Sequence, residues 1–129
     1  MTIGAFDGLH RGHHTLIKTI KQLSHKTGSP SIVATFESPP QSLLSPTSYP
    51  GELTSLPQKM DILSQWGVDY CLLLPCTREF FALSPEDFYD QCVMPLLHPS
   101  HVIVGANHTF GVDQSGTSET LKQLASLHG

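Results

Sequence analysis

The sequence predicts an α/β fold in which a parallel sheet carries helices on both of its faces. Two observations support this class. Short runs of apolar or β-branched residues alternate along the chain with segments in which apolar residues recur at helical spacing. The segments between these runs are long enough for the crossover helices that parallel strands need. The chain has 129 residues, so residues 1–129 are expected to form one domain.

Four strands are expected, because four short runs are apolar enough for strands buried in a parallel sheet. They are Thr2–Phe6, Ser31–Phe36, Tyr70–Leu74 and His101–Val104. Between the second and third runs, residues 37–57 contain five prolines, too many for regular structure inside a compact domain. We expect a long loop there, and a loop of that length is often functional.

Four helices are expected as well. Apolar periodicity and stop signals predict helices at about Gly12–Lys26, Pro57–Trp66 and Ser118–Leu127. A further helix should begin after Ser84, since this serine can act as N-cap and is followed by proline and two acidic residues. Pro95 is expected to end or kink that helix.

Composition excludes several classes of protein. Hydrophobic residues make up 39% of the chain and charged residues 14%, as in an ordinary globular domain. No apolar run approaches the ~20 residues that a membrane helix needs, and the first strand follows Met1 without a signal peptide, so we expect a cytoplasmic protein with no membrane partner. The net charge of −4 argues against a nucleic-acid partner. The three cysteines lack metal-ligand spacing and are expected to be reduced thiols.

The most informative motif is the run at residues 4–13, Gly-Ala-Phe-Asp-Gly-Leu-His-Arg-Gly-His. It lies where the first strand should turn into the first helix, so His10 and His13 face backbone N–H groups and the positive end of the helix dipole. An anion that enters this turn would meet both imidazoles. Gly8 permits a tight turn, and Gly12 lets a phosphate approach the backbone closely.

Other interpretations of these residues remain open. A bare histidine pair with this spacing is more often a surface or capping feature, and a zinc site would need further ligands that no workable spacing supplies. Asp7 is more simply explained as a residue that braces its turn. Lys59 and Arg78 suit phosphate binding and solvated helix faces equally well. The remaining histidines, among them His14 and His25, are expected to be ordinary surface or core residues.

The histidine motif resembles the signature of the nucleotidyltransferase superfamily, and the whole decapeptide resembles the start of the bacterial FAD synthetases. Later segments follow the order of that family. Thr35–Pro40 resembles its Thr-Phe-Glu-Pro-His-Pro segment, and Leu53-Thr54 with Lys59 resembles its Leu-Thr-x-x-x-x-Lys stretch. Residues 104–111 resemble its Val-Gly-x-Asp/Asn-Phe-x-Phe-Gly block. The resemblance implies a Rossmann-like nucleotidyltransferase fold and an FMN adenylyltransferase, which makes FAD and pyrophosphate from ATP and FMN.

The resemblance also implies roles for individual residues. His10 and His13 would be catalytic, as donors of hydrogen bonds to the ATP phosphates. The residues implied to bind ATP are Gly4, Phe6, Asp7, Gly8, His10, Gly12, His13, Gly105, Asn107 and Gly111. The residues implied to bind the flavin are Phe36, Pro39 and Thr54. Mg²⁺ would accompany ATP and bind through phosphate oxygens rather than a carboxylate cage, with Asn107 in its surroundings.

Three positions depart from the family pattern, since Pro39, His108 and Gln114 replace a histidine, an aromatic residue and an arginine. The family's Ile-Ser-Ser-Thr-x-x-Arg segment and its riboflavin kinase domain would follow Gly129, so we expect the fold to be C-terminally incomplete. Two alternative functions therefore stay open. One is an inactive or fragmentary module that binds a nucleotide or a flavin, and the other is a sister nucleotidyltransferase with a different phosphate acceptor.

Overall fold

The computed structural model describes residues 1–6, 11–37, 43, 47, 51, 55–105 and 108–127. The chain divides into two compact units, Met1–Cys76 and Thr77–Gly129. Within the described residues, no helix is both long and apolar enough to cross a lipid bilayer.

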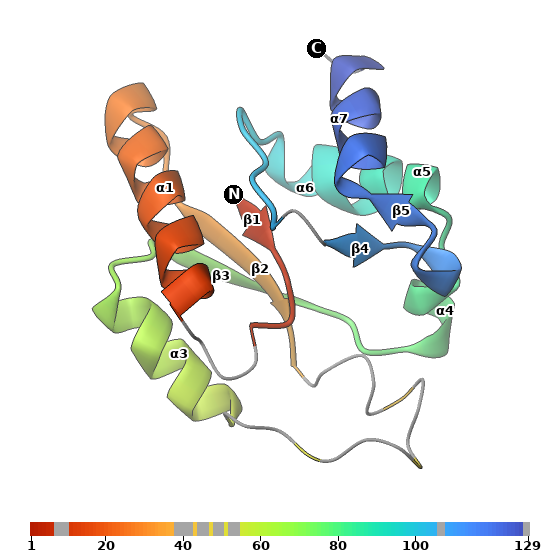
Figure 1. Ribbon diagram of the computed structural model, residues 1–129, viewed down its shortest axis with the longest axis horizontal. Helices are drawn as coiled ribbons and strands as arrows, with labels where there is room; N and C mark the ends of the chain where they lie inside the picture. Colours follow the sequence, from red (N-terminus) through yellow and green to blue (C-terminus); the bar gives the residue numbers. More distant parts are fainter. Residues whose placement is uncertain are drawn as a thin grey trace. The chain divides into compact units, whose positions relative to one another are not determined.

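The first unit is a three-stranded parallel sheet with two helices (Figure 1). Its strands β1 (Thr2–Ile3), β2 (Ile32–Phe36) and β3 (Tyr70–Leu74) lie in sequential order, with Thr2 opposite Val33 and Ile32 opposite Tyr70. Helix α1 (Arg11–Thr27) connects β1 to β2, and α3 (Leu56–Gln65) precedes β3. Right-handed crossovers between strands in sequential order put both helices on the same face. The predicted α/β class with a parallel sheet is confirmed.

Strand β2 lies in the middle of the sheet, and its three central residues are buried. Val33, Ala34 and Thr35 are each at most 1% exposed, as expected for the central strand of a parallel sheet, whereas Ile32 and Phe36 at its ends are half-buried. Helix α1 adds Ile17, which is fully buried, and α3 adds Leu63, which is 2% exposed. The predicted helix boundaries are confirmed to within a residue at each end for both α1 and α3.

The ends of these helices follow the signals in the sequence. At the start of α3, the Ser55 hydroxyl accepts a hydrogen bond from the Gln58 backbone N–H at 3.3 Å, and the Gln58 side chain accepts one from the Ser55 N–H at 3.0 Å. This reciprocal capping box satisfies two backbone donors that the helix leaves without partners. Helix α1 is followed by Gly28, whose φ of +73° is a conformation that favours glycine.

The second unit contains short helices and a small hairpin. Its elements are α4 (Arg78–Phe81), α5 (Pro85–Phe88), the π-helical turn η1 (Tyr89–Val93), α6 (Met94–Leu97), β4 (Thr109–Phe110), the 3₁₀ turn η2 (Val112–Gln114), β5 (Gly116–Thr117) and α7 (Ser118–Leu127). The bounds of α7 agree with the predicted helix, and Ser84 caps α5 as predicted by accepting a hydrogen bond from the Asp87 N–H at 3.1 Å. The sequence patterns did not predict α4 or the antiparallel β4–β5 hairpin.

Two predictions about elements are corrected. Residues 101–104 have irregular backbone instead of a strand, since a run with β-propensity forms a strand only where it fits a partner surface. The first strand ends at Ile3 rather than Phe6, and Phe6 has a φ of +51°, outside the strand region.

Pro95 is predicted to end or kink its helix. The helical segment that begins at α5 changes to the wider turn η1 directly before Met94, and Pro95 lies at the start of α6, which continues to Leu97.

The burial of Leu63 gives a direct test of this core. Replacement of Leu63 by alanine should lower the free energy of unfolding by about 2–5 kcal/mol, because it removes buried methyl groups and leaves a cavity. Met60 on the same helix is 36% exposed, so Met60→Ala should cost less than about 1 kcal/mol. Urea unfolding of both variants measures the difference. Equal losses would contradict the assignment of Leu63 to the core.

Candidate functional site

One backbone oxygen fixes the chain where it leaves β1. The carbonyl of Ala5 accepts a hydrogen bond from the Thr35 hydroxyl on β2 at 3.1 Å and another from the Lys59 ammonium on α3 at 2.8 Å. One residue earlier, the Gly4 N–H donates to the Ala34 carbonyl at 3.0 Å, which extends the β1–β2 pairing beyond the strand. The exit of β1, the strand β2 and the helix α3 therefore meet at Ala5. We call this arrangement the Ala5 clamp.

Lys59 is the unexpected member of the clamp. Its side chain is only 3% exposed, and a buried ammonium is tolerated when hydrogen bonds compensate its lost hydration. Its place on a solvated helix face, one of the two interpretations of the sequence, is therefore wrong. Spacing could have shown this, because Lys59 lies on the same helical stripe as the apolar residues Leu56 and Leu63. Burial raises the pKa of the nearby Cys71 thiol, and the positive charge of Lys59 partly opposes that rise.

Phe6 follows the clamp in a strained conformation. A left-handed backbone costs a residue with a side chain about 1–2 kcal/mol, so the surrounding packing must compensate. The Phe6 ring is 3% exposed and meets the ring of His13 edge-on, with 5.0 Å between the ring centres. It also covers Gly4 so closely that a Cβ atom there would come within 3.1 Å of the ring. Gly4 therefore provides the space that Phe6 occupies.

His13 and His14 lie side by side in the first turn of α1 and point to different places. His13 is half-buried against Phe6 and has a buried Nδ1 atom. The exposed His14 instead faces Trp66 at the end of α3, with 4.7 Å between the ring centres. Of these two neighbouring histidines, His13 of the sequence motif is directed toward the exit of β1, and His14, just after the motif, is directed away from it.

The described residues include only some of the predicted site. Gly4, Phe6, Gly12 and His13 come together where β1 leads into α1. Phe36 ends β2, and the carboxyl ends of parallel strands share one edge of a sheet, where ligands of such folds bind. The remaining predicted residues Asp7, Gly8, His10, Pro39, Thr54 and Asn107 lie outside the described residues.

Gly105 and Gly111 belong to the second unit. The Gly105 carbonyl accepts a hydrogen bond from the His108 N–H at 3.0 Å. Gly111 has a φ of +76°, and a Cβ atom at this position would come within 2.8 Å of the Pro85 nitrogen. Only glycine fits both the conformation and the space there.

His108, one of the departures from the family pattern, behaves as an aromatic residue. Its ring stacks on Phe110 with 5.9 Å between the ring centres and 18° between the planes. Phe110 in turn contacts Phe88. Burial lowers the pKa of His108, because the charged imidazolium loses hydration, so the neutral ring is the form that this cluster favours. The substitution therefore keeps a stacking face.

The described residues contain no group of three or more His, Cys, Asp and Glu side chains placed to hold a metal ion. Magnesium needs few protein ligands when it arrives with a phosphate-bearing substrate, since it keeps waters and takes phosphate oxygens. The described groups around His13 that can act as hydrogen-bond donors are its imidazole and the backbone N–H groups at the start of α1.

Comparison with known proteins agrees with this geometry. The sequence model of the protein family described as FAD synthetase matches residues 1–129. The bifunctional riboflavin kinase/FMN adenylyltransferase of Escherichia coli strain K12 is 33% identical over 129 residues, which cover all of this chain and 41% of that protein. The protein of the same name from Bacillus subtilis strain 168 is 33% identical over 122 residues, or 94% of this chain and 38% of that protein.

A solved structure shows a similar fold. It is titled as a macrolide-efflux protein from Streptococcus pneumoniae, and it is similar to this chain with a TM-score of 0.82 and 27% identity. The match covers 95% of this chain and 41% of that one. The chain thus spans about two fifths of the length of the relatives to which it is similar.

The Ala5 clamp predicts a specific effect of losing the Lys59 ammonium. Lys59→Met keeps most of the side-chain volume but removes the donor to the Ala5 carbonyl, so the free energy of unfolding should fall by about 1–3 kcal/mol. The backbone N–H groups of Gly4 and Phe6 should then exchange faster with solvent deuterium. Lys26→Met, at an exposed position of α1, is the control. Unchanged exchange at Gly4 and Phe6 in Lys59→Met would contradict the role of the clamp.

Proposed function

Because the chain belongs to the FAD synthetase family, we propose that it transfers AMP from ATP to FMN. In this reaction a phosphate oxygen of FMN attacks the α-phosphorus of ATP and forms a new O–P bond. The bond from the α-phosphorus to the oxygen that leads to the β-phosphorus breaks, and pyrophosphate leaves with that oxygen and its electron pair. FAD is the second product.

The observation that supports the proposal most strongly is which residues, acidic or basic, occupy the first turn of α1. The first turn of this 17-residue helix has no acidic residue, so within the described helix no carboxylate lies at the positive end of the dipole. Arg11, Gly12 and His13 lie there instead. His13 is directed to the exit of β1, which the Ala5 clamp fixes. A triphosphate in this place would meet backbone N–H groups and an imidazole together.

Catalysis in this proposal consists of positioning and charge stabilisation. The attacking oxygen already belongs to a phosphate, so no side chain has to act as nucleophile. His13 and His10 donate hydrogen bonds to phosphate oxygens as negative charge moves toward the leaving pyrophosphate. The Ala5 clamp fixes the exit of β1, and Phe6 packs on His13, so the His13 imidazole is positioned by packing rather than by the substrate.

The other predicted residues complete the proposed site. Mg²⁺ bound with ATP would supply positive charge to the phosphate oxygens. The role of the protein residues would be to hold those phosphates in line with the attacking oxygen of FMN. The further residues that we propose to contact ATP are Gly4, Phe6, Asp7, Gly8, Gly12, Gly105, Asn107 and Gly111. The residues that we propose to contact the flavin are Phe36, Pro39 and Thr54.

An assay of FAD formation from FMN and ATP with Mg²⁺ tests the proposal. His13→Ala should lower kcat by about a hundredfold or more, as loss of one donor to a charged transition state does. The melting temperature should change by less than about 4 °C, because the ring lies at the surface of the core rather than inside it. His101→Ala, at an exposed position, should leave the rate unchanged.

Other results would favour the alternative functions. Binding of ATP without formation of FAD, measured by calorimetry on the same sample, would point to a nucleotide-binding module. Transfer of a nucleotide to a different phosphate acceptor would point to a sister transferase. A His13→Ala variant that loses stability and activity in parallel would show that His13 acts in packing rather than in charge stabilisation.

A further inference from the structure

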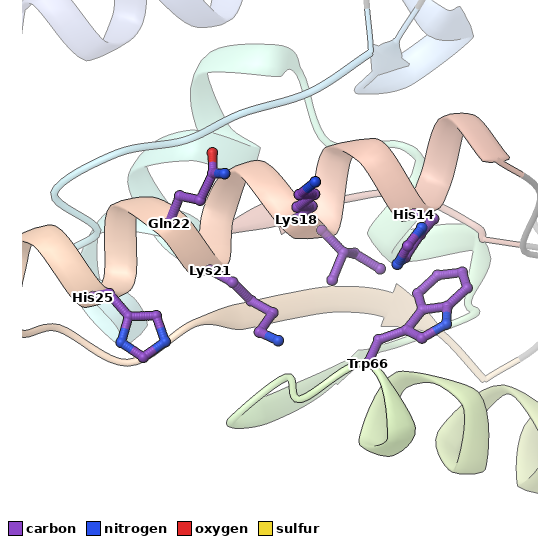
Figure 2. Close-up of a pocket in the computed structure, with 7 residues that line it drawn as sticks. His14, Lys18, Lys21, Gln22, His25 and Trp66 are labelled. Carbon is purple, nitrogen blue, oxygen red and sulfur yellow. The ribbon is translucent and has the colours of Figure 1, made fainter.

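A pocket lies on the first unit, between the exposed side of α1 and the end of α3 (Figure 2). Its volume is about 200 Å³, and the buried Ile17 is among the residues that line it. The polar and aromatic side chains that line it are His14, Lys18, Lys21, Gln22, His25 and Trp66. None of these residues has a part in the proposed adenylyl transfer.

The charges around this pocket are concentrated on one helix. The chain has a net charge of −4, yet α1 carries four of its seven lysines and arginines and no acidic residue. His14, Lys18, Lys21 and His25 are spaced by four, three and four positions, so they form a single ridge along the helix. Neighbouring cations on such a ridge repel one another, and an anion in the pocket would relieve that repulsion.

The local surroundings compensate this charge only in part. Lys21 extends toward the end of α3 (Figure 2), where its ammonium lies 2.8 Å from the position a Cβ atom would take on Gly67. The carboxyl end of a helix favours a cation. The positive charges of His25 and Lys21 also help to lower the pKa of Asp69, after the larger effect of its hydrogen bonds from Ser31. Lys18, in contrast, is exposed.

Trp66 and Gly67 give the pocket its shape. Figure 2 shows the Trp66 ring facing His14 at one end of the pocket, and the side chain of Trp66 is half-buried. Gly67 has a φ of +80° and no side chain, which leaves space for the Lys21 side chain at the other helix. The end of α3 thus places an aromatic ring beside the helix face that carries Lys18 and Lys21.

We propose that this pocket binds a free anion with two or more linked phosphate groups. Lysine side chains are flexible, so the Lys18 and Lys21 ammonium groups can both turn onto such an anion, and the Gln22 amide adds a donor. The volume is below the roughly 300–1,000 Å³ of pockets that enclose whole small molecules. It suits linked phosphates better than a complete nucleotide. The site is separate from the turn at His13, because His13 and His14 point in different directions.

The single tryptophan of the chain makes the proposal testable without an activity assay. Trp66 is that residue, so its fluorescence reports on this pocket alone. Titration with pyrophosphate at constant ionic strength should give a saturable change, and inorganic phosphate should bind more weakly. A Lys18→Gln/Lys21→Gln double variant should raise the Kd by about tenfold or more, since each charged donor contributes a substantial share of the affinity.

Two controls decide where the anion binds. Lys26→Gln removes the same charge from the same helix outside the pocket and should change the Kd by less than about twofold. His13→Ala should leave the Trp66 signal intact. The proposal is overturned if pyrophosphate gives no saturable change, if Lys26→Gln weakens binding as much as the double variant, or if His13→Ala alone abolishes the signal. None of these outcomes depends on formation of FAD. The proposed anion site and the proposed adenylyl transfer can therefore fail independently of each other.

Discussion

The carbonyl oxygen of Ala5 is the point on which the arrangement of the first unit depends. It accepts hydrogen bonds from Thr35 in the central strand and from the buried ammonium of Lys59 on α3. These two donors add to the hydrogen bond from the Gly4 N–H to the Ala34 carbonyl in fixing the chain after Ile3, since β1 itself has only two residues. With them, the backbone can reverse at Phe6 into a conformation that it would not adopt alone. The packing of the Phe6 ring on His13 follows from that reversal.

This constraint connects the sheet to the chemistry proposed for the domain. Phe6, which follows the clamp, packs on His13 in the first turn of a helix that lacks acidic residues. The carboxyl ends of parallel strands are where ligands of such folds bind. Further along the same helix, Lys18 and Lys21 line the pocket beside Trp66. Helix α1 therefore presents two anion-attracting places in a chain that is acidic as a whole. The local distribution of charge, rather than its sum, determines what such a protein can bind.

The sequence predicted those features that depend on local signals. Apolar periodicity and caps located α1, α3 and α7, and the glycine–histidine run located the turn to which Gly4, Phe6 and His13 contribute. Predictions failed where tertiary contacts decide. The run His101–Val104 has strand propensity but no strand conformation. For Lys59 the sequence leaves phosphate binding and a solvated helix face equally open, and its burial against the Ala5 carbonyl excludes the solvated face. The orientation of His14 toward Trp66 could not be predicted, because it depends on how α1 and α3 pack.

A double-mutant cycle between Lys59 and His13 tests this account most directly. If Lys59 acts by holding the turn that directs His13, then Lys59→Met should lower kcat/KM for FAD formation in the wild-type background and have little further effect in His13→Ala. The coupling free energy should exceed about 0.5 kcal/mol, the range found for residues that share a structural unit. Purely additive effects of the two substitutions would contradict the account, because they would mean that the buried ammonium and the imidazole act independently.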